Sequence, residues 1–346
     1  MTPEVIILLK SKFVIKGFYT LKHPQIANQK RNIKKVNYLQ KAIVTGANGF
    51  VGSWLCKELS DHGVKVTAIV RNEESDISKI KTLPNIKIVY CTLDEIETLP
   101  YKINNELHDV FFHLAWEGAG GKARSDYSLQ LKNVKYSCDC AKVAKIIGCN
   151  KFLSSGTITE KIAEDILNIK SKAENTIYGI CKHTTHCMLD VLCENLGIHY
   201  VWMRFANIYG PNSINGNIVG YTISEFIRGN IPTFSKAEQP YDLLYIEDLV
   251  KAIYLIGKVQ NTKNCYYIGS GNTKQLREYL ILIKEIYGKG SEISLGNRAE
   301  DNLFYNKEWF NTNDLIEDVG FTCEYSFEAG IQKTIRWIKE NIDYVI

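Results

Sequence analysis

The sequence predicts an α/β fold in which a doubly wound parallel sheet carries helices on both faces. Two observations predict it. Short apolar, β-branched segments alternate with amphipathic helical segments over much of the chain, and several of the strands are apolar almost throughout. Strict alternation implies parallel pairing through right-handed crossovers, and continuous apolar strands are typical of a sheet covered on both sides. The 346 residues allow one large domain and a smaller lobe.

The expected elements follow one another in the order that this fold requires. Strands are predicted at residues 42–44, 65–70, 86–90, 109–115, 151–154 and 199–204, and long helices at residues 50–59, 127–147 and 175–196. From about residue 207 the alternation loosens and loops take up more of the chain. Ligands of such sheets lie beyond the carboxyl ends of the strands, so the loops there are where a site is expected.

Three glycines spaced every third residue follow the first strand directly. Glycine permits a tight turn and lets the backbone approach a phosphate without a Cβ in the way. The helix N-terminus that follows offers free N–H groups and the positive end of a dipole. The spacing is Gly-x-x-Gly-x-x-Gly rather than Gly-x-Gly-x-x-Gly, and such a turn by itself can be an ordinary loop. Its place between strand and helix favours a dinucleotide site formed by Gly46, Asn48, Gly49, Phe50, Val51 and Gly52.

The sequence is predicted to divide into three parts. Residues 39–206 are predicted to form an NAD(P)-binding Rossmann-type domain, and residues 207–346 mainly a smaller α/β lobe that binds the substrate and returns some segments to the first domain. Residues 1–38 are basic with almost no acids, and their apolar run at residues 5–9 is too short to span a bilayer. The order of charge and apolar run is the reverse of a signal peptide. We expect a disordered extension or an upstream translation start outside the fold.

Composition excludes several functional classes. Hydrophobic residues make up 45% and charged residues 23% of the chain, as in an ordinary soluble enzyme. The net charge of +4 is small, and no basic and aromatic stripe indicates nucleic-acid binding. The ten cysteines form no Cys-x-x-Cys pair, and His and Cys do not cluster at metal-ligand spacings. We therefore expect reduced thiols, no metal, no membrane segment and a cytoplasmic location.

Arg71 stands at the end of the second predicted strand. NAD-selective folds usually place an acidic residue there, against the ribose 2′-hydroxyl, whereas an arginine can pair with the 2′-phosphate of NADP. The alternative is a solvated arginine in a loop. We predict that NADP(H) is favoured and that NAD(H) remains possible.

Tyr178 and Lys182 lie one helical turn apart, so both side chains leave the same face of a helix. A tyrosine is a poor base at its reference pKa of about 10, but a neighbouring ammonium and a cationic nicotinamide stabilise the phenolate and lower that pKa. The fifth strand ends in a serine-rich turn at residues 154–157. A hydroxyl from this turn could hydrogen-bond the same substrate oxygen, although each signal is weak alone.

Together these segments resemble one family. The glycine turn, His113-Leu-Ala115, Ser154-Ser-Gly-Thr157 and Tyr178-Gly-Ile-Cys-Lys182 occur in the order and spacing of the extended short-chain dehydrogenases/reductases. Similar segments in the C-terminal half are Arg204-Phe-Ala-Asn207-Ile-Tyr209-Gly210-Pro211, Asp242-Leu-Leu-Tyr245-Ile-Glu247-Asp248, Tyr267-Ile-Gly-Ser-Gly271, Arg298-Ala-Glu-Asp301, Asp314-Leu315 and Gly320-Phe321. Residues 41–340 thus resemble the NAD(P)-dependent nucleotide-sugar epimerase/dehydratase branch of that family.

The resemblance implies a role for each candidate residue. Tyr178 would be the acid/base at the sugar oxygen, Ser155 would hold the same oxygen, and Lys182 would bind the nicotinamide ribose and tune Tyr178. Further residues that would contact the cofactor are Leu114 and Ala115, and those that would contact the substrate are Thr157, Trp116, Asn207 and Arg298. Asn207 and Arg298 are candidates for the nucleotide diphosphate, because a guanidinium fork suits phosphate oxygens.

The chain also departs from the family pattern. In the sugar 4,6-dehydratases an Asp-Glu pair after the catalytic hydroxyl supplies the acid and base for eliminating water, but Gly156 and Thr157 stand there. Neither can transfer a proton at neutral pH, so a 4,6-dehydratase is not expected. Tyr241 replaces an arginine of the phosphate site, and Thr92 replaces an aspartate near the adenine. Trp116 replaces a small residue and either walls the sugar pocket or belongs to the core.

These departures leave three hypotheses. The first is a 4-ketoreductase that acts on a nucleotide-linked 4-keto-6-deoxyhexose, with Tyr178 as general acid. The second is a nucleotide-sugar 4-epimerase with tightly bound NAD, which would need no added cofactor. The third is a non-catalytic NADP-sensing protein, which is less expected because this chain keeps both Tyr178 and Lys182. The resemblance also implies a homodimer through helices at residues 128–147 and 175–196.

Overall fold

The computed structural model describes residues 39–341, apart from residues 165, 168–172, 214–215, 289 and 300–304. The predicted extension at residues 1–38 lies outside the described residues. The predicted domain boundaries therefore stay a prediction. Within the described residues, no helix is both long and apolar enough to cross a bilayer.

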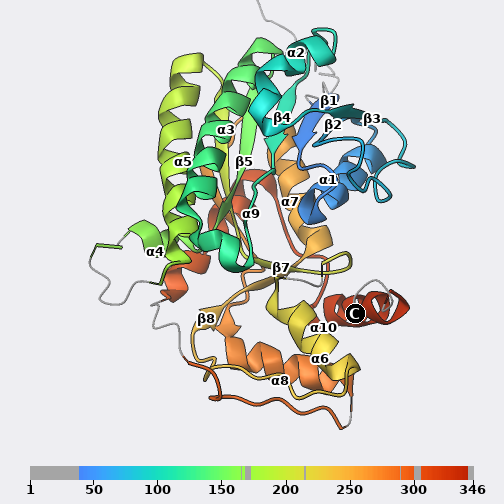
Figure 1. Cartoon of the computed structure of the whole chain (residues 1–346), viewed down its shortest axis with the longest axis vertical. Coiled ribbons are helices and arrows are strands. Elements are labelled where there is room, and N and C mark those ends of the chain that lie inside the picture. The colour runs from blue at the N-terminus through green and yellow to red at the C-terminus, as the bar shows by residue number, and fades with distance from the viewer. Residues whose placement is uncertain are drawn as a thin grey trace, which may run out of the picture. The chain divides into compact units, whose positions relative to one another are not determined.

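A seven-stranded sheet forms the centre of the structure (Figure 1). Its strands are β1 (Lys41–Thr45), β2 (Lys65–Val70), β3 (Ile86–Tyr90), β4 (Val110–His113), β5 (Lys151–Thr157), β6 (His199–Phe205) and β10 (Cys265–Ile268). They lie in the order β10-β6-β5-β4-β1-β2-β3, and every pair is parallel. The predicted doubly wound α/β fold is confirmed. Because β1 pairs with both β2 and β4, the crossovers reverse direction there, and a crevice opens at the carboxyl ends of these strands.

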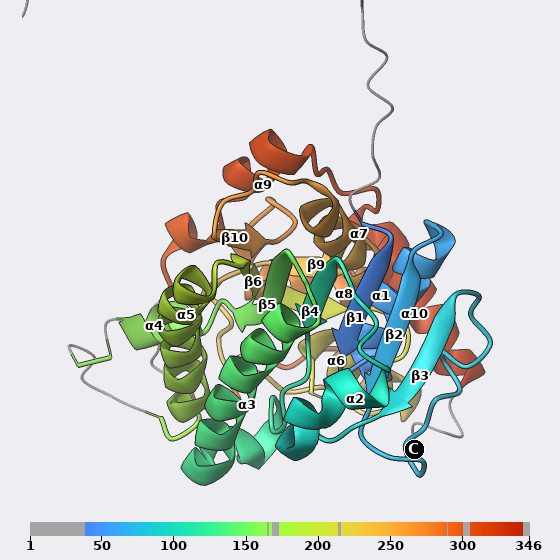
Figure 2. The same cartoon turned by 90° about the horizontal axis from the view of Figure 1, so that it is seen from above.

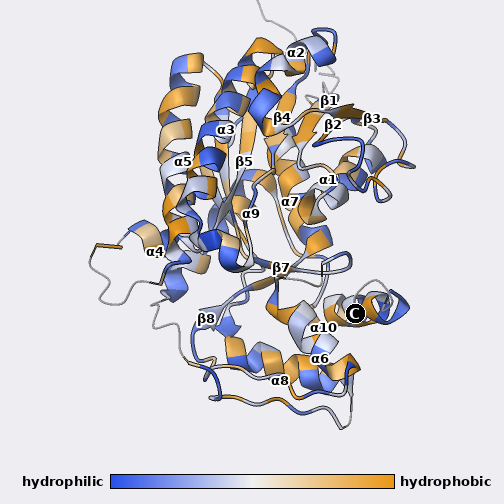
Figure 3. Ribbon diagram, in the orientation of Figure 1, coloured by the Kyte–Doolittle hydropathy of each residue, from blue (hydrophilic) through white to orange (hydrophobic). Residues whose placement is uncertain are grey.

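Alternation along the strands divides the core into two layers. In β1, Ala42 and Val44 belong to the cluster that includes Leu55 of α1 (Phe50–Asp61) and Ile253 of α7 (Ile246–Lys258). Ile43 belongs to the cluster that includes Ala144 of α3 (Tyr127–Ile146). Successive strand residues point to opposite faces, so both faces of an apolar strand become buried. Figure 2 shows α3 and α5 (Thr176–Leu196) on one side of the strands and α7 on the other. Figure 3 shows the hydrophobic colouring of the central strand β4.

The helices are α1 (Phe50–Asp61), α2 (Leu99–Lys102), α3 (Tyr127–Ile146), α4 (Glu160–Glu164), α5 (Thr176–Leu196), α6 (Ile218–Ile227), α7 (Ile246–Lys258), α8 (Leu276–Tyr287), α9 (Asn313–Val319) and α10 (Phe327–Glu340). Three 3₁₀ helices are η1 (Leu93–Thr98), η2 (Gly121–Ser125) and η3 (Lys307–Phe310). The strands at residues 65–70 and 86–90 match the prediction. The strand predicted at 109–115 is shorter, and the one at 151–154 continues to Thr157, which carries the serine-rich turn into the sheet.

The part of the chain after residue 207 contributes both to the main sheet and to a separate group of helices. Strand β10 pairs with β6 at the edge of the main sheet, and α7 packs against α1. Helices α6, α8 and α10 gather below the sheet in Figure 1. Two small sheets accompany them, formed by β7 (Asn207–Tyr209) with β9 (Leu243–Tyr245) and by β8 (Pro240–Tyr241) with β11 (Lys274–Gln275).

Candidate active site

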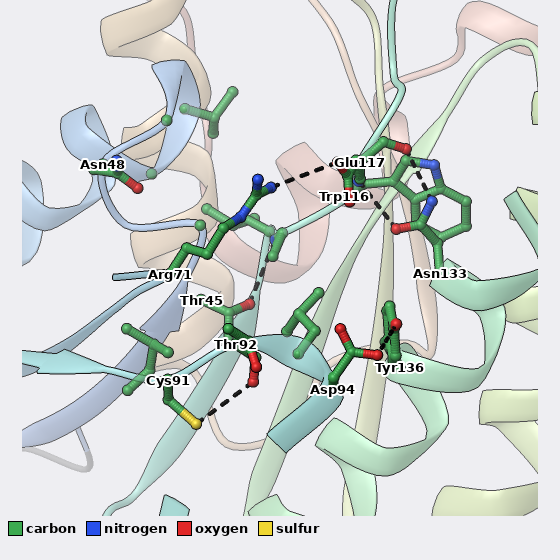
Figure 4. Close-up of a pocket in the computed structure, with 18 of the residues that line it drawn as sticks. Thr45, Asn48, Arg71, Cys91, Thr92, Asp94, Trp116, Glu117, Asn133 and Tyr136 are labelled. Atoms are coloured by element: carbon green, nitrogen blue, oxygen red, sulfur yellow. Dashed lines mark hydrogen bonds and ion pairs between the residues drawn. The ribbon is translucent and has the colours of Figure 1, made fainter. Parts of the chain in front are cut away.

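A pocket of about 530 Å³ lies at the carboxyl ends of β1, β2 and β4 (Figure 4). Its size is within the range of cofactor and ligand sites in proteins, roughly 300–1,000 Å³. It lies where strand order reverses, which is where doubly wound sheets bind their ligands. It is lined by Thr45, Gly46, Asn48, Gly49, Phe50, Val51, Gly52, Ile69, Arg71, Cys91, Thr92, Leu93, Asp94, Leu114, Ala115, Trp116, Glu117, Asn133 and Tyr136.

Two glycines of the turn are required by close approach of the backbone. Gly46 has φ +68°, and a Cβ there would lie 2.9 Å from the Ala115 nitrogen. A Cβ on Gly52 would lie 2.0 Å from the Gly46 carbonyl oxygen. Helix α1 begins after Gly49, which makes no side-chain capping hydrogen bond, so no side chain of the cap covers the N–H groups of the first turn. The turn is thus a backbone cradle that side chains would fill, and it fits a dinucleotide pyrophosphate.

The structure brings together all the residues predicted to bind the cofactor except Lys182. The glycine-turn residues, Arg71, Leu114 and Ala115 all line the pocket, and so does Thr92. Lys182 is 2% exposed and is not part of the lining. Tyr136 and Asn133 of α3 were missed, because the helical pattern does not show which polar face turns toward the pocket. Asp94 follows the end of β3, and that position could have indicated it.

A buried network joins the pocket to the centre of the sheet. Thr45 Oγ1 and His113 Nδ1 lie 2.9 Å apart, and His113 Nε2 lies 3.0 Å from Ser137 Oγ. The Ala115 nitrogen donates to Thr45 Oγ1 at 3.4 Å. Burial, with a further effect of Lys182, lowers the pKa of His113 to about 3. The imidazole is therefore neutral at physiological pH and positions the loop after β4 through hydrogen bonds.

Arg71 extends across the pocket from the end of β2 (Figure 4). Its Nη2 atom lies 3.8 Å from Glu117 Oε1, and both side chains are more than half exposed. The Glu117 backbone is held to α3 by two hydrogen bonds with the Asn133 side chain, of 3.0 and 2.9 Å. An exposed pair of this kind is weak, so the guanidinium can exchange its partner for a phosphate.

Tyr178 and Lys182 lie on α5 and are both buried, at 8% and 2% exposure. Lys182 Nζ donates to the Ser155 carbonyl oxygen at 2.7 Å, which joins α5 to the end of β5. The Ser155 side chain is also buried. Lys182 and Ser155 thus meet at the carboxyl end of β5, and Tyr178 faces Thr157 of the same strand.

Trp116 lies between the pocket and this cluster. Its ring lies edge-on to Tyr178, with ring centroids 6.0 Å apart, and the Lys182 Nζ atom lies 3.7 Å from the indole centroid. The indole nitrogen donates to Gln130 Oε1 at 2.8 Å, which fixes the ring. Trp116 also lines the pocket. Its role as a wall of the sugar pocket stays a prediction.

Burial shifts the pKa values of the two groups in opposite directions. It raises the pKa of Tyr178 to about 12; Arg124 lowers that pKa, Glu160 raises it, and a hydrogen bond with Thr157 lowers it. Burial lowers the pKa of Lys182 to about 7, against the effect of Glu160. The shift of the tyrosine is opposite to the one that the Tyr178–Lys182 spacing predicts, because loss of hydration outweighs the nearby charges.

A buried carboxylate supports the turn after β5. Glu160 accepts from the Thr157 nitrogen at 2.9 Å and from the Trp202 indole nitrogen at 2.8 and 3.0 Å. Its Oε1 lies 3.4 Å from Arg204 Nε, and the residue is fully buried. A Cβ on Gly156 would lie 2.4 Å from the Trp202 indole nitrogen and 2.7 Å from Glu160 Oε1. The space that a side chain at position 156 would need is therefore occupied.

A family model confirms the resemblance that the motifs carry. The model of the NAD dependent epimerase/dehydratase family matches residues 42–269, about two thirds of the chain. The chain belongs to this family. It is accordingly an enzyme of the extended short-chain dehydrogenase/reductase class.

Relatives within the family share about a quarter of their residues with this chain. CDP-abequose synthase from Salmonella muenchen is 24% identical over 86% of this chain and 97% of its own. UDP-N-acetyl-alpha-D-glucosaminuronate decarboxylase from Bacillus cytotoxicus is 26% identical, and the match covers 87% of this chain and 98% of the relative. UDP-glucose 4-epimerase from Thermotoga maritima, solved with UDP-glucose, has the same fold, with a TM-score of 0.73 and 20% sequence identity. The match covers 88% of this chain and 100% of the epimerase chain.

The two residues predicted to bind the substrate diphosphate form hydrogen bonds within this chain. Asn207 begins β7, and its side chain donates to the Asp242 carbonyl oxygen at 3.4 Å. Arg298 is exposed and donates to Tyr221 Oη at 2.7 Å and to Thr233 Oγ1 at 3.0 Å. The structure gives no contact between Asn207 and Arg298. Their roles at the diphosphate stay predictions.

Proposed function

We propose that this enzyme is a nucleotide-sugar 4-ketoreductase that acts on a nucleotide-linked 4-keto-6-deoxyhexose. The proposal rests on two features that occur together. Tyr178 is buried, and the turn after β5 offers no free carboxylate. Because burial raises the pKa of Tyr178 to about 12, its phenol keeps its proton at neutral pH. A protonated phenol is the form that can donate a proton to the oxygen of a ketone as the ketone is reduced.

The turn after β5 argues against elimination of water from the sugar. Elimination needs an acid and a base beside the catalytic tyrosine, and Gly156 and Thr157 supply neither. Glu160 lies close by, but its carboxylate is fully buried and already bonded to Trp202 and Arg204. A carboxylate held in this way cannot reach a sugar carbon. Reduction, which needs one proton donor, fits the residues that are present.

Each residue of the cluster has a proposed task. Tyr178 would donate its proton to the C4 oxygen, and the hydroxyl groups of Ser155 and Thr157 would orient that oxygen. Lys182 would hold the nicotinamide ribose, and Trp116 would wall the sugar-binding site next to the pocket. The nicotinamide ring supplies the hydride when it is bound. Asn207 and Arg298 would bind the diphosphate of the substrate.

We propose NADP(H) as the preferred cofactor and NAD(H) as a possible one. Arg71 lines the pocket at the end of β2, where a 2′-phosphate would be recognised, and its exposed pair with Glu117 is easily exchanged. The solved epimerase from Thermus thermophilus and the dehydratase from Bacillus anthracis, which share the fold, contain NAD. The cradle itself suits either cofactor, because the glycine turn contacts the part that they share.

The experiment is a screen of GDP-, CDP-, UDP- and dTDP-linked 4-keto-6-deoxy sugars with NADPH or NADH. We expect oxidation of the reduced cofactor, followed by its absorbance, with one of these substrates and not with the corresponding 4-hydroxy sugars. Purified protein that consumes no reduced cofactor with any of them would contradict the proposal.

A 4-epimerase is the second candidate, favoured by the similarity to the solved UDP-glucose 4-epimerase. It would use the same Tyr178 and Lys182 but would keep its nicotinamide bound. Interconversion of two 4-hydroxy sugars with no added cofactor would identify it. Binding of NADPH without turnover of any sugar would instead identify the third candidate, a cofactor sensor.

We also propose a homodimer through α3 and α5. The two helices pack against each other, and exposed apolar side chains remain on them. These include Leu131 on α3 and Met188 and Val191 on α5. Sedimentation of the purified protein would test the dimer, and charged substitutions at Met188 and Val191 should yield monomers.

A further inference from the structure

Among the residues that the structure describes, three cationic side chains lie near the reaction centre, and two of them already have partners. Arg204 is paired with Glu160 at 3.4 Å and with Glu164 at 2.9 Å. Lys182 donates to the Ser155 carbonyl oxygen and lies against the Trp116 ring. The third is Arg124, which the sequence motifs did not indicate. It lies in η2, between β4 and α3.

Arg124 lies on the face of the proposed acid. Its Cζ atom is 4.4 Å from the centroid of the Tyr178 ring. Its Nη2 atom lies 3.4 Å from Thr159 Oγ1, a long hydrogen bond. Its Nε–H is buried without a hydrogen-bond partner, and within the described part of the chain Arg124 forms no ion pair. Arg124 as a whole is only half-buried, but a buried donor that is left without a partner costs free energy, so this placement calls for a function.

The charge of Arg124 persists where that of Lys182 does not. Burial lowers the pKa of Lys182 to about 7, so its ammonium is lost as the pH rises above neutrality. A guanidinium stays protonated at every pH at which proteins are folded. When the Tyr178 phenol ionises, Arg124 is therefore the cation that still faces its ring. A cation over an aromatic ring is attracted more strongly when the ring carries negative charge.

We propose that Arg124 is a positioning residue of the reaction centre, whose guanidinium stacks on the Tyr178 ring and stabilises the phenolate. It does so in place of the ammonium that the Tyr-x-x-x-Lys spacing suggests. Arg124 then offsets part of the cost of burying Tyr178 and makes the phenol a better proton donor. This inference rests on the proposed role of Tyr178 as acid/base.

The other groups that face Tyr178 act in both directions. Arg124 of η2 lowers the pKa of the phenol, the buried Glu160 of α4 raises it, and a hydrogen bond with Thr157 of β5 lowers it. Lys182, on the same helix, is held at the Ser155 oxygen. Any test must therefore change Arg124 while leaving Glu160, Thr157 and Lys182 in place.

The direct test uses 3,5-difluorotyrosine at position 178, whose phenol is more acidic than that of tyrosine and titrates while the protein is folded. Fluorine NMR then follows this one phenol without any need for activity. We expect Arg124→Gln to raise its pKa by about one unit or more, a tenfold loss of phenolate at a given pH. Arg124→Lys, which keeps a cation, should raise it less. Lys122→Gln removes a charge from the same exposed 3₁₀ helix and should leave it unchanged.

The kinetic test uses the oxidation of a 4-hydroxy sugar nucleotide, in which Tyr178 must be ionised. The rising limb of the pH profile should move to higher pH by the same amount in Arg124→Gln, and the rate at neutral pH should fall about tenfold. Difluorotyrosine at position 178 should restore most of this loss. A rate loss that is equal at every pH, or a fluorine titration that does not change, would overturn the inference. A protein with a shifted titration but no turnover of any sugar nucleotide would instead contradict the proposed function alone.

Discussion

The cofactor pocket and the reaction centre meet at Trp116, but they are built in different ways. The pocket is an open crevice made largely of backbone, in which Gly46 and Gly52 leave space that a side chain would fill. The reaction centre is packed, and its Tyr178 and Lys182 are almost fully buried.

This difference separates what a motif can show from what it cannot. A backbone cradle needs residues that are close in sequence, so the glycine spacing together with its place between a strand and a helix is sufficient to find it. A packed centre depends on side chains that reach it from distant segments. Arg124 and Trp116 come from the loop between β4 and α3, and Glu160 comes from α4. The electrostatics of Tyr178 are set by these neighbours and not by its own helix.

The largest effect is expected when the reaction centre loses its proton donor. Tyr178→Phe should lower turnover by ~10²–10⁴ and leave the affinity for NADPH unchanged, because Tyr178 does not line the pocket. Steady-state rates and a cofactor titration measure the two quantities. Tyr136→Phe, which removes a phenol from the pocket side, is the matched control and should keep its turnover at saturating cofactor. Near-normal turnover in Tyr178→Phe would remove this residue from the mechanism.

The second effect concerns the cofactor pocket, where a substitution should weaken cofactor binding. Gly52→Val would place a Cβ only 2.0 Å from the Gly46 carbonyl oxygen, so the turn must shift. Overpacking of this kind costs roughly 1–3 kcal/mol, so cofactor affinity should fall about 10- to 100-fold. Fluorescence titration with NADPH measures it. Gly120→Ala is the control, because a Cβ there meets open space. Unchanged affinity in Gly52→Val would show that the turn does not contact the cofactor.

A smaller effect tests how the pocket chooses its cofactor. Arg71→Ala should weaken binding of NADPH about tenfold, the typical loss of one exposed charge-assisted contact. The affinity for NADH should stay within about twofold, because NADH has no 2′-phosphate. The ratio of the two dissociation constants is therefore the informative quantity. Equal losses for both cofactors would assign Arg71 to a contact that they share.

The last effect concerns the network between the two regions. Burial keeps the pKa of His113 near 3, below its ordinary value of 6.5. As the pH falls below 6.5, the unfolded chain takes up a proton that the folded chain does not. The free energy of unfolding should then fall by up to about 1.4 kcal/mol per pH unit until the pH approaches about 3. Urea unfolding at several pH values measures this slope. His113→Gln should reduce it, and an identical slope would show that other groups cause the acid sensitivity.

Much of the fold could be predicted from the sequence because the information is local. Strands such as β2 and β3 are short apolar runs bounded by polar residues, and the predicted bounds match. The end of β5 was placed too early, because Ser154 to Thr157 resemble a polar turn. Pairing with β6 over the whole segment keeps it in the sheet. A polar segment becomes a strand there because its neighbour satisfies its backbone hydrogen bonds.

The sequence alone determined the alternation of strands and helices and the glycine cradle, since each depends on neighbours within one turn or one strand. Only the tertiary structure decided the state of Tyr178 and Lys182. Their pKa values depend on burial and on charges carried by other elements, Arg124 on one side and Glu160 on the other. Spacing along a helix shows that two side chains share a face, but it does not show what covers that face.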